Sequence, residues 1–182
     1  MATTETLFTA EEFLLLPDNG QLNELARGRI VMMNVPYYRH GKLCSRIDRL
    51  VGNFVDEREL GTMISNAGVI TERGPDSVRG PDVAFFSYQR IPKGADPAAY
   101  AEIAPEIVFE VRSPSDRAKL MLEKVTEYLN AGVLAVCVVE PTDETVIVHY
   151  SDRAAVTLTS DQDLTFPEIL PGFSLPLQRL FR

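Results

Sequence analysis

The stretch from residue 107 to residue 139 constrains the fold more than any other part of the chain. Residues 107–112 have the pattern of a strand, and residues 133–139 are a continuous apolar run, typical of a strand covered on both faces. Residues 116–131, between them, have helical periodicity and end before Gly132. A strand, a crossover helix and a second strand predict two parallel neighbours in an α/β fold. The helix is expected to turn inward Ala118, Met121, Leu122, Val125 and Leu129.

Cap and turn signals indicate the other elements. Thr9-Ala10-Glu11-Glu12 has the pattern of a capping box, which predicts a short helix ending before Pro17. Arg27-Gly28 predicts a hairpin turn between two short strands within residues 22–34, and Ser113-Pro114-Ser115-Asp116 predicts caps for the later helix. A helix is expected at residues 38–60, with Gly61 as its end. Strands are expected at 62–72 and 82–86, followed by a loop at 87–105. Residues 145–150 and 154–159 should form a hairpin, and the tail at 169–173 should pack over the core.

Length and composition fit one globular domain over residues 1–182. Apolar residues make up 45% and charged residues 24%, which is ordinary for a protein in water. No apolar run approaches the roughly 20 residues of a membrane span. Residues 1–7 lack the basic region and apolar core of a signal peptide. The cytoplasm is therefore the expected location, without a membrane partner.

The chain's two cysteines and two histidines limit the metal chemistry that it can offer. Cys44 and Cys137 do not indicate a disulfide framework. With only His40 and His149, they could complete a four-ligand zinc site only if acids joined them. Both cysteines have apolar neighbours and are expected in the core.

Charge is distributed unevenly along the chain. The net charge is −8, which argues against a protein that coats nucleic acid. Residues 25–50 nevertheless contain six basic residues against one acid, a local charge of +5 that leaves −13 for the rest. One stripe of the predicted 38–60 helix could meet phosphates while the acidic remainder repels DNA elsewhere, although the acids could equally serve solubility. The stripe consists of Arg39, Lys42, Arg46 and Arg49, with His40 at the start of the helix as a further candidate contact.

Two acids lie in strand-like apolar surroundings. Asp82 opens the strand at 82–86, and Glu110 follows Ile107-Val108-Phe109. Burying a carboxylate is costly without a partner, and strand alternation puts Glu110 and Arg112 on one face. A buried ion pair of Arg112 with Glu110 or Asp82 is one explanation. The other is a Mg²⁺ or Mn²⁺ site, because Mg²⁺ takes one or two carboxylates and retains waters. A shared site requires the two carboxylates to lie within about 6 Å of each other.

An ordered set of short motifs runs from about residue 9 to the C-terminus. It comprises Thr9-Ala10-Glu11-Glu12-Phe13, Asn23-Glu24-Leu25 with Gly28, His40-Gly41, Pro81-Asp82-Val83-Ala84-Phe85, residues 105–115, Lys124 with Tyr128, Ala131-Gly132-Val133, Val139-Glu140-Pro141 and Leu170-Pro171-Gly172-Phe173. In this order the chain resembles the Uma-two family of restriction endonucleases, within the PD-(D/E)XK nuclease superfamily. The resemblance implies a restriction-endonuclease-like mixed β-sheet flanked by α-helices. It also implies a metal site of Asp82 and Glu110, assisted by Glu24.

The chain departs from the superfamily pattern two residues after the second acid. Arg112 stands where that pattern has a lysine, and the resemblance suggests that the lysine has moved to Lys124. On a helical wheel Lys124 lies at the edge of the apolar stripe beside Tyr128, while Glu123 and Glu127 point away. The alternative is a surface lysine in helix ion pairs worth a few tenths of a kcal/mol.

The catalytic reading of Lys124 makes two predictions. The ammonium should lie within about 5 Å of Asp82 or Glu110. Lys124→Ala should lower cleavage by about 10²-fold or more and leave folding nearly unchanged. Arg112, which cannot deprotonate, could act only as an electrostatic clamp.

The leading hypothesis is hydrolysis of DNA by a Mg²⁺-dependent nuclease. Asp82 and Glu110 would bind the metal, Glu24 would be a third acid or would orient the metal-bound water, and Lys124 would stabilise the transition state. A different class is also open: a nucleic-acid-binding or self-assembling module on the same fold, a homodimer for example, that does not cleave. Hydrolysis of another phosphodiester is a third alternative. Ser113 and Ser115 are expected to be caps, because no histidine lies near them in sequence to activate a nucleophile.

Overall fold

The computed structural model describes residues 6–17, 20–114 and 117–182. Its main sheet has the strand order β10-β9-β8-β7-β6-β3. Only β7 and β8 pair in parallel, and the other neighbours are antiparallel, so the sheet is mixed. The parallel pair predicted from the sequence is confirmed. The strands are β3 (Gly61–Ile64), β6 (Val83–Ser87), β7 (Ile107–Val111), β8 (Ala135–Glu140), β9 (Thr145–Tyr150) and β10 (Val156–Leu158).

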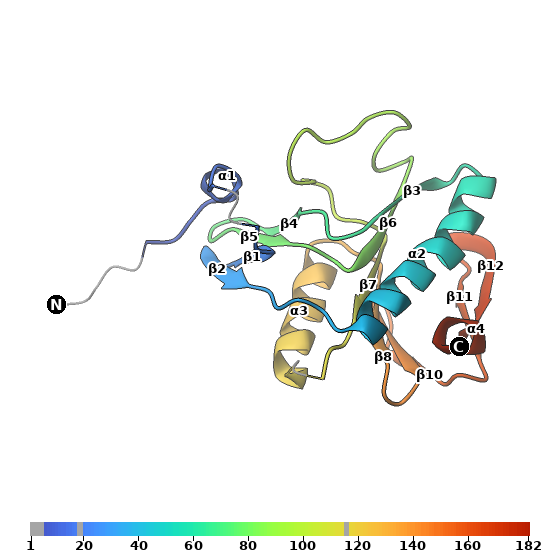
Figure 1. Cartoon of the computed structure of the whole chain (residues 1–182). Coiled ribbons are helices and arrows are strands. Elements are labelled where there is room, and N and C mark those ends of the chain that lie inside the picture. Colours follow the sequence, from blue (N-terminus) through green and yellow to red (C-terminus); the bar gives the residue numbers. More distant parts are fainter. Residues whose placement is uncertain (1–5, 18–19, 115–116) are drawn as a thin grey trace.

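Each face of this sheet has its own hydrophobic core, because alternate side chains of a strand point to opposite faces. One face packs against α2 (Tyr38–Glu57), the hairpin of β11 (Asp163–Phe166) and β12 (Leu170–Pro176), and α4 (Leu177–Phe181). The other face packs against α3 (Ala118–Asn130) through Val125 and Tyr128. Figure 1 shows α2 and α3 on the two sides of β7.

A second sheet, of strand order β2-β1-β5-β4, lies beside the first (Figure 1). It contains β1 (Asn23–Ala26), β2 (Arg29–Met32), β4 (Val69–Glu72) and β5 (Ser77–Arg79). Arg27 and Gly28 both have positive φ, 49° and 77°, as a two-residue hairpin turn of the primed type requires. A side chain at Gly28 would also lie 2.6 Å from Cβ of Leu7. The predicted hairpin is therefore confirmed.

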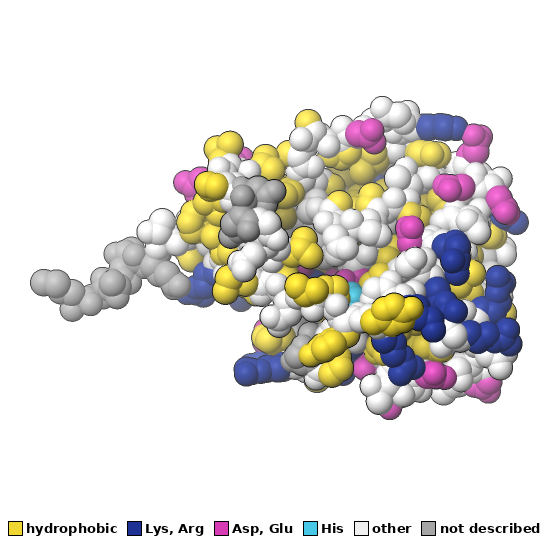
Figure 2. Space-filling view, in the orientation of Figure 1, with side chains coloured by type: hydrophobic (Ala, Val, Ile, Leu, Met, Phe, Trp, Pro, Cys, Tyr) yellow, Lys and Arg dark blue, Asp and Glu magenta, His cyan; other side chains and the backbone are white. Residues whose placement is uncertain are grey.

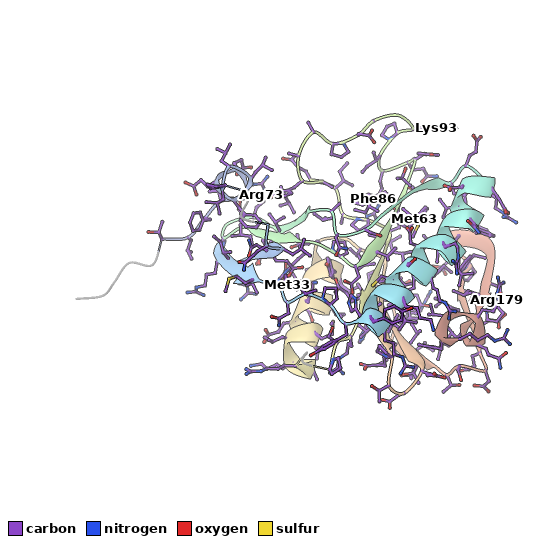
Figure 3. The ribbon with its side chains drawn as sticks, in the orientation of Figure 1. Met33, Met63, Arg73, Phe86, Lys93 and Arg179 are labelled. Carbon is purple, nitrogen blue, oxygen red and sulfur yellow. The ribbon has the colours of Figure 1, made fainter. Side chains whose placement is uncertain are left out.

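The short helix α1 (Ala10–Leu14) packs on the second sheet. Thr9 and Glu12 form the reciprocal capping box that the sequence predicts. Ala10 and Phe13 are buried with Leu25 of β1 and Val78 of β5. Arg73, labelled in Figure 3, ties the helix to the sheet by pairing with Glu11 and Asp76.

Several predicted elements differ from the structure. The single strand expected at 62–72 is two strands, β3 and β4, in different sheets, and β5 was not predicted. The tail forms β12 and α4, and is thus more regular than expected. In α3, Leu122 is 56% exposed and Ala118 is exposed, because the helix buries a narrower stripe than its apolar periodicity suggests. Arg117 caps α3 without a side-chain bond, and the predicted caps at residues 115 and 116 lie outside the described residues.

Across the described residues, the structure contains no helix that is both long enough and apolar enough to cross a membrane.

Candidate active site

Asp82 and Glu110 lie on neighbouring strands of the main sheet, Asp82 directly before β6 and Glu110 within β7. In the antiparallel register of β6 and β7, Val83 pairs with Phe109, so that the next position places Asp82 opposite Glu110. Directly opposed residues have Cβ atoms about 4.5–5.5 Å apart on the same face. The Asp82 carboxylate also accepts a hydrogen bond of 2.7 Å from the backbone N–H of Val111. The two acids are thus cross-strand neighbours, as joint metal ligation requires.

Glu110 is buried and bonded to two side chains of α3. Lys124 Nζ lies 2.9 Å from its Oε1 and donates to its Oε2 at 3.0 Å. The Tyr128 hydroxyl donates to Oε1 at 2.8 Å. Burial raises the pKa of Glu110 to about 7, with Asp82 and Glu24 adding to the rise and Lys124 opposing it. Glu110 therefore gains a proton more readily than an ordinary carboxyl.

Glu24 reaches the same lysine from the second sheet. Its Oε1 lies 2.9 Å from Lys124 Nζ and accepts the N–H of Gly80 at 3.1 Å, and its Oε2 accepts from Arg79 at 3.0 Å. Burial disfavours the charged form of Glu24, but Lys124 and Arg79 outweigh it and lower the pKa. Glu24 thus remains an anion in the interior, where it holds Lys124 toward Glu110.

The sequence correctly placed Lys124 near the acid pair. Its side chain is 12% exposed and it lies well within 5 Å of Glu110, so the surface-lysine alternative is wrong. Burial disfavours its charge, but Glu110 and Glu24 raise the pKa of Lys124 above its ordinary value. Lys124 is therefore a cation at neutral pH. Whether it acts in catalysis stays a prediction.

A further ion pair, between Arg79 and Glu127, lies next to the Glu24–Lys124 contact and was not predicted from the sequence. Arg79 donates to Glu127 at 2.9 and 2.5 Å, and Thr71 also donates to Glu127. The expectation that Glu127 points away from the site is wrong, because the second sheet covers that side of α3 and supplies Arg79 as its partner. Arg79 lies only three residues before Asp82, but its partner Glu127 is 48 positions away, and no local pattern indicates this pair.

An ion pair of Arg112 with Glu110 or Asp82 was one of two explanations for the strand acids. The Arg112 guanidinium donates to Glu140 at 2.8 Å, across the parallel strands β7 and β8. Among the described residues, Arg112 forms its ion pair with Glu140 and not with Glu110 or Asp82, and Lys124 provides the cation at Glu110.

His40 and Cys44 lie on the opposite side of Asp82, on α2. His40 Nε2 is 3.1 Å from Asp82 Oδ2, and its Nδ1 is 3.4 Å from Cys44 Sγ. His40 is half-buried and contacts Asp82, whereas Arg39, Lys42 and Arg49 of the basic stripe are exposed. Cys44 is half-buried and packs against the edge of the core, while Cys137 is buried within it as expected. Burial raises the pKa of the Cys44 thiol to about 12, helped by the charges of Asp82 and Glu110.

The basic stripe of α2 is partly occupied by contacts within the protein. Arg39 pairs with Glu144 at 3.2 Å, and Arg46 donates to the carbonyl of Leu180 at 3.1 Å. Figure 2 shows Lys and Arg side chains gathered where α2 and α4 lie. A hollow of about 500 Å³ on this surface is lined by Pro36, Tyr37, Tyr38, Gly41, Lys42, Ser45, Arg46 and Arg49.

The acids of the site fit a hard divalent cation. Mg²⁺ prefers oxygen ligands, and the Asp82 carboxylate is near enough to Glu110 for its charge to raise the pKa of Glu110. Within the described ranges, Asp82 Oδ1 accepts no hydrogen bond, since both contacts of this carboxylate are to Oδ2. When all four ionise, the acids of the cluster exceed Lys124 and Arg79 by two charges, which a divalent cation would balance. These acids are Glu24, Asp82, Glu110 and Glu127.

Comparisons with known proteins agree with this geometry. A family model described as "Uma2: Putative restriction endonuclease" matches residues 10–178. The fold is similar to a solved structure described as a "putative nuclease belonging to DUF820 from Anabaena variabilis ATCC 29413". The TM-score is 0.84 and the sequence identity 21%, over 96% of this chain and 97% of that one. This similarity confirms the predicted restriction-endonuclease-like fold class. A comparison with curated proteins gives no match.

Proposed function

The chain belongs to the Uma2 family, described as "Putative restriction endonuclease", and from this we propose that it is a Mg²⁺- or Mn²⁺-dependent nuclease that hydrolyses DNA. One observation carries the proposal: the Lys124 ammonium is buried between Glu24 and Glu110. Asp82 supports it, because its carboxylate accepts from the backbone N–H of Val111, next to Glu110. Paired carboxylates with an adjacent fixed cation are the groups that phosphodiester hydrolysis needs.

Each residue of the cluster has a distinct part in this proposal. A bound divalent cation would polarise the phosphate and lower the pKa of a bound water. Asp82 and Glu110 would hold that cation, and Lys124 would offset the charge that builds on the phosphoryl oxygens. Glu24 would keep Lys124 in position. The water oxygen forms a bond to phosphorus while one ester P–O bond breaks; the water proton leaves to solvent, and the departing oxygen takes up a proton.

The basic stripe of α2 is the proposed contact with the DNA backbone. Lys42 and Arg49 are exposed and line the hollow, whereas Arg39 and Arg46 already have partners in the protein. We propose that the first two carry most of the phosphate contact. The cytoplasmic location and a homodimeric assembly are retained as predictions from the sequence.

The double variant Lys42→Ala/Arg49→Ala is expected to weaken DNA binding and to reduce its salt dependence. Each phosphate contact contributes about 0.9 to the slope of log K against log salt, so the slope should fall by about 2. Fluorescence anisotropy with a labelled duplex at several salt concentrations measures this. Lys93→Ala/Arg153→Ala removes the same charge elsewhere and should leave the slope nearly unchanged. An equal change in both double variants would make the stripe ordinary surface.

Cleavage by the unmodified chain separates a nuclease from a module that only binds nucleic acid. The net charge of −8 and the arginine at position 112 favour the second candidate. A nuclease should nick supercoiled DNA with Mg²⁺ or Mn²⁺ and stop in EDTA, with RNA as the alternative substrate in parallel. Binding without cleavage of either polymer in Mg²⁺ or Mn²⁺ would favour the module.

A further inference from the structure

We propose that His40, Cys44 and Asp82 form a binding site for a thiophilic divalent cation such as Zn²⁺, next to the carboxylate cluster and sharing Asp82 with it. One donor atom from each of the three lies within 4.8 Å of the other two. Nitrogen and sulfur donors select Zn²⁺ and Co²⁺ over Mg²⁺. The proposal therefore concerns a different ion from that of the nuclease reaction and is independent of it.

The helix α2 places the first two donors together. His40 and Cys44 are four residues apart, so they lie on one face of the helix, one turn from each other. Tetrahedral zinc has bonds of about 2.0–2.1 Å to imidazole nitrogen and about 2.3 Å to sulfur, which separates two such ligands by about 3.5 Å. His40 Nδ1 and Cys44 Sγ are 3.4 Å apart. This pair already has the spacing of two ligands of one ion.

Asp82 supplies the third, oxygen donor from the start of β6. Its Oδ2 now contacts the other ring nitrogen of His40, at 3.1 Å. Binding the ion beside Nδ1 requires rotation of the Asp82 side chain, while the two helix residues keep their positions. The side chains of His40 and Asp82 are 13% and 15% exposed, so solvent reaches the cluster. Three protein ligands and a water would complete a four-coordinate site of the open type.

The proposed Zn²⁺ and Mg²⁺ sites share Asp82, which has a consequence for cleavage if the chain is a nuclease as proposed. An ion held by His40, Cys44 and Asp82 would withdraw the Asp82 carboxylate from the Mg²⁺ site. Zn²⁺ would then inhibit cleavage, and the Cys44→Ser variant would be less sensitive. An absence of Zn²⁺ inhibition would not overturn the metal site, because metal binding is measured separately by titration.

Titration of the full-length, metal-free protein with Co²⁺ under reducing conditions tests the site directly. A thiolate ligand gives a near-ultraviolet charge-transfer band, which should saturate at one Co²⁺ per chain. Cys44→Ser should abolish this band and weaken binding by at least about 10²-fold, since loss of a mere outer-shell partner already costs 10–100-fold. Asp82→Asn should weaken binding but keep the band, because the sulfur ligand remains.

Cys137→Ala provides the matched control, because Cys137 is fully buried in β8 and is not part of the His40–Cys44–Asp82 group. It should keep the full band, and circular dichroism should show that every variant is folded. The proposal is overturned if the folded, unmodified chain gives no thiolate band at saturating Co²⁺. Persistence of the band in Cys44→Ser, or its loss in Cys137→Ala alone, would overturn it as well.

Discussion

Lys124→Ala is expected to reduce the free energy of unfolding by about 3–5 kcal/mol, because it leaves buried carboxylates without their shared cation. Glu24 and Glu110 both lie 2.9 Å from the ammonium and both are buried. The sequence suggested that folding would be nearly unchanged, as for a lysine at a helix edge. The structure corrects that expectation, since this lysine joins the two sheets.

Urea denaturation at pH 8 measures the effect of this variant. Lys119→Ala is the matched control, since Lys119 lies on the same helix with its side chain 87% exposed and pairs only at the surface with Glu123. It should change stability by less than about 1 kcal/mol. Equal effects of the two substitutions would show that the buried pairs of Lys124 contribute little to stability.

Cleavage by Lys124→Ala is expected to fall by about 10²-fold or more, as for the loss of a transition-state donor. The assay must be run well below the melting temperature of the variant, with circular dichroism as evidence of folding. Normal cleavage by the folded variant would transfer the catalytic cation to Arg112. If Arg112→Ala also cleaves normally, neither residue supplies the catalytic cation, and the nuclease proposal loses this part of its mechanism.

Glu110→Gln is expected to remove a pH dependence from stability while it abolishes metal-dependent cleavage. The pKa of Glu110 is raised by burial from 4.5 to about 7, so the folded state holds a proton that the unfolded state releases. This contribution is fully present below about pH 4.5 and is lost as the pH rises through about 7. At about 1.4 kcal/mol per pKa unit, the loss is about 3 kcal/mol.

Unfolding free energies of the two proteins in EDTA, from pH 5 to pH 8, test the linkage. The stability of the unmodified chain relative to Glu110→Gln should decline across this range, because other titrating groups are common to both proteins. Glu123→Gln, on the exposed side of α3, should follow the unmodified chain. A difference that stays constant with pH would show that Glu110 has an ordinary pKa in the folded protein.

The same substitution should lower cleavage by at least about 10²-fold, since even outer-shell partners of a metal contribute 10–100-fold. Mg²⁺ should also stabilise the unmodified chain and not Glu110→Gln, because a ligand that binds only the folded state raises its stability. Retained cleavage would remove Glu110 from the metal site, and the proposed chemistry would fail.

Local signals predicted much of the fold. The parallel pair β7–β8, the helix between these strands and the capping box at Thr9 all arise within short stretches of chain. The turn at Arg27-Gly28 is another local feature. Hydrophobic periodicity determines which side of an element is buried, and cap and turn residues determine where it ends. The apolar surroundings of Asp82 and Glu110 likewise marked the strand acids as unusual, whereas Lys124 and Glu24 entered through the family resemblance.

Only the tertiary structure decided the partners of these residues. Glu24 and Arg79 are 55 positions apart, Arg79 and Glu127 are 48 apart, and His40 and Asp82 are 42 apart. Their meeting depends on how the second sheet and α2 dock on the main sheet. That docking is set by packing of the whole core, and no local pattern encodes it. The sequence by itself therefore determined most of the elements and the unusual acids, whereas docking decided that Lys124 is buried between two carboxylates and that His40 lies at Asp82.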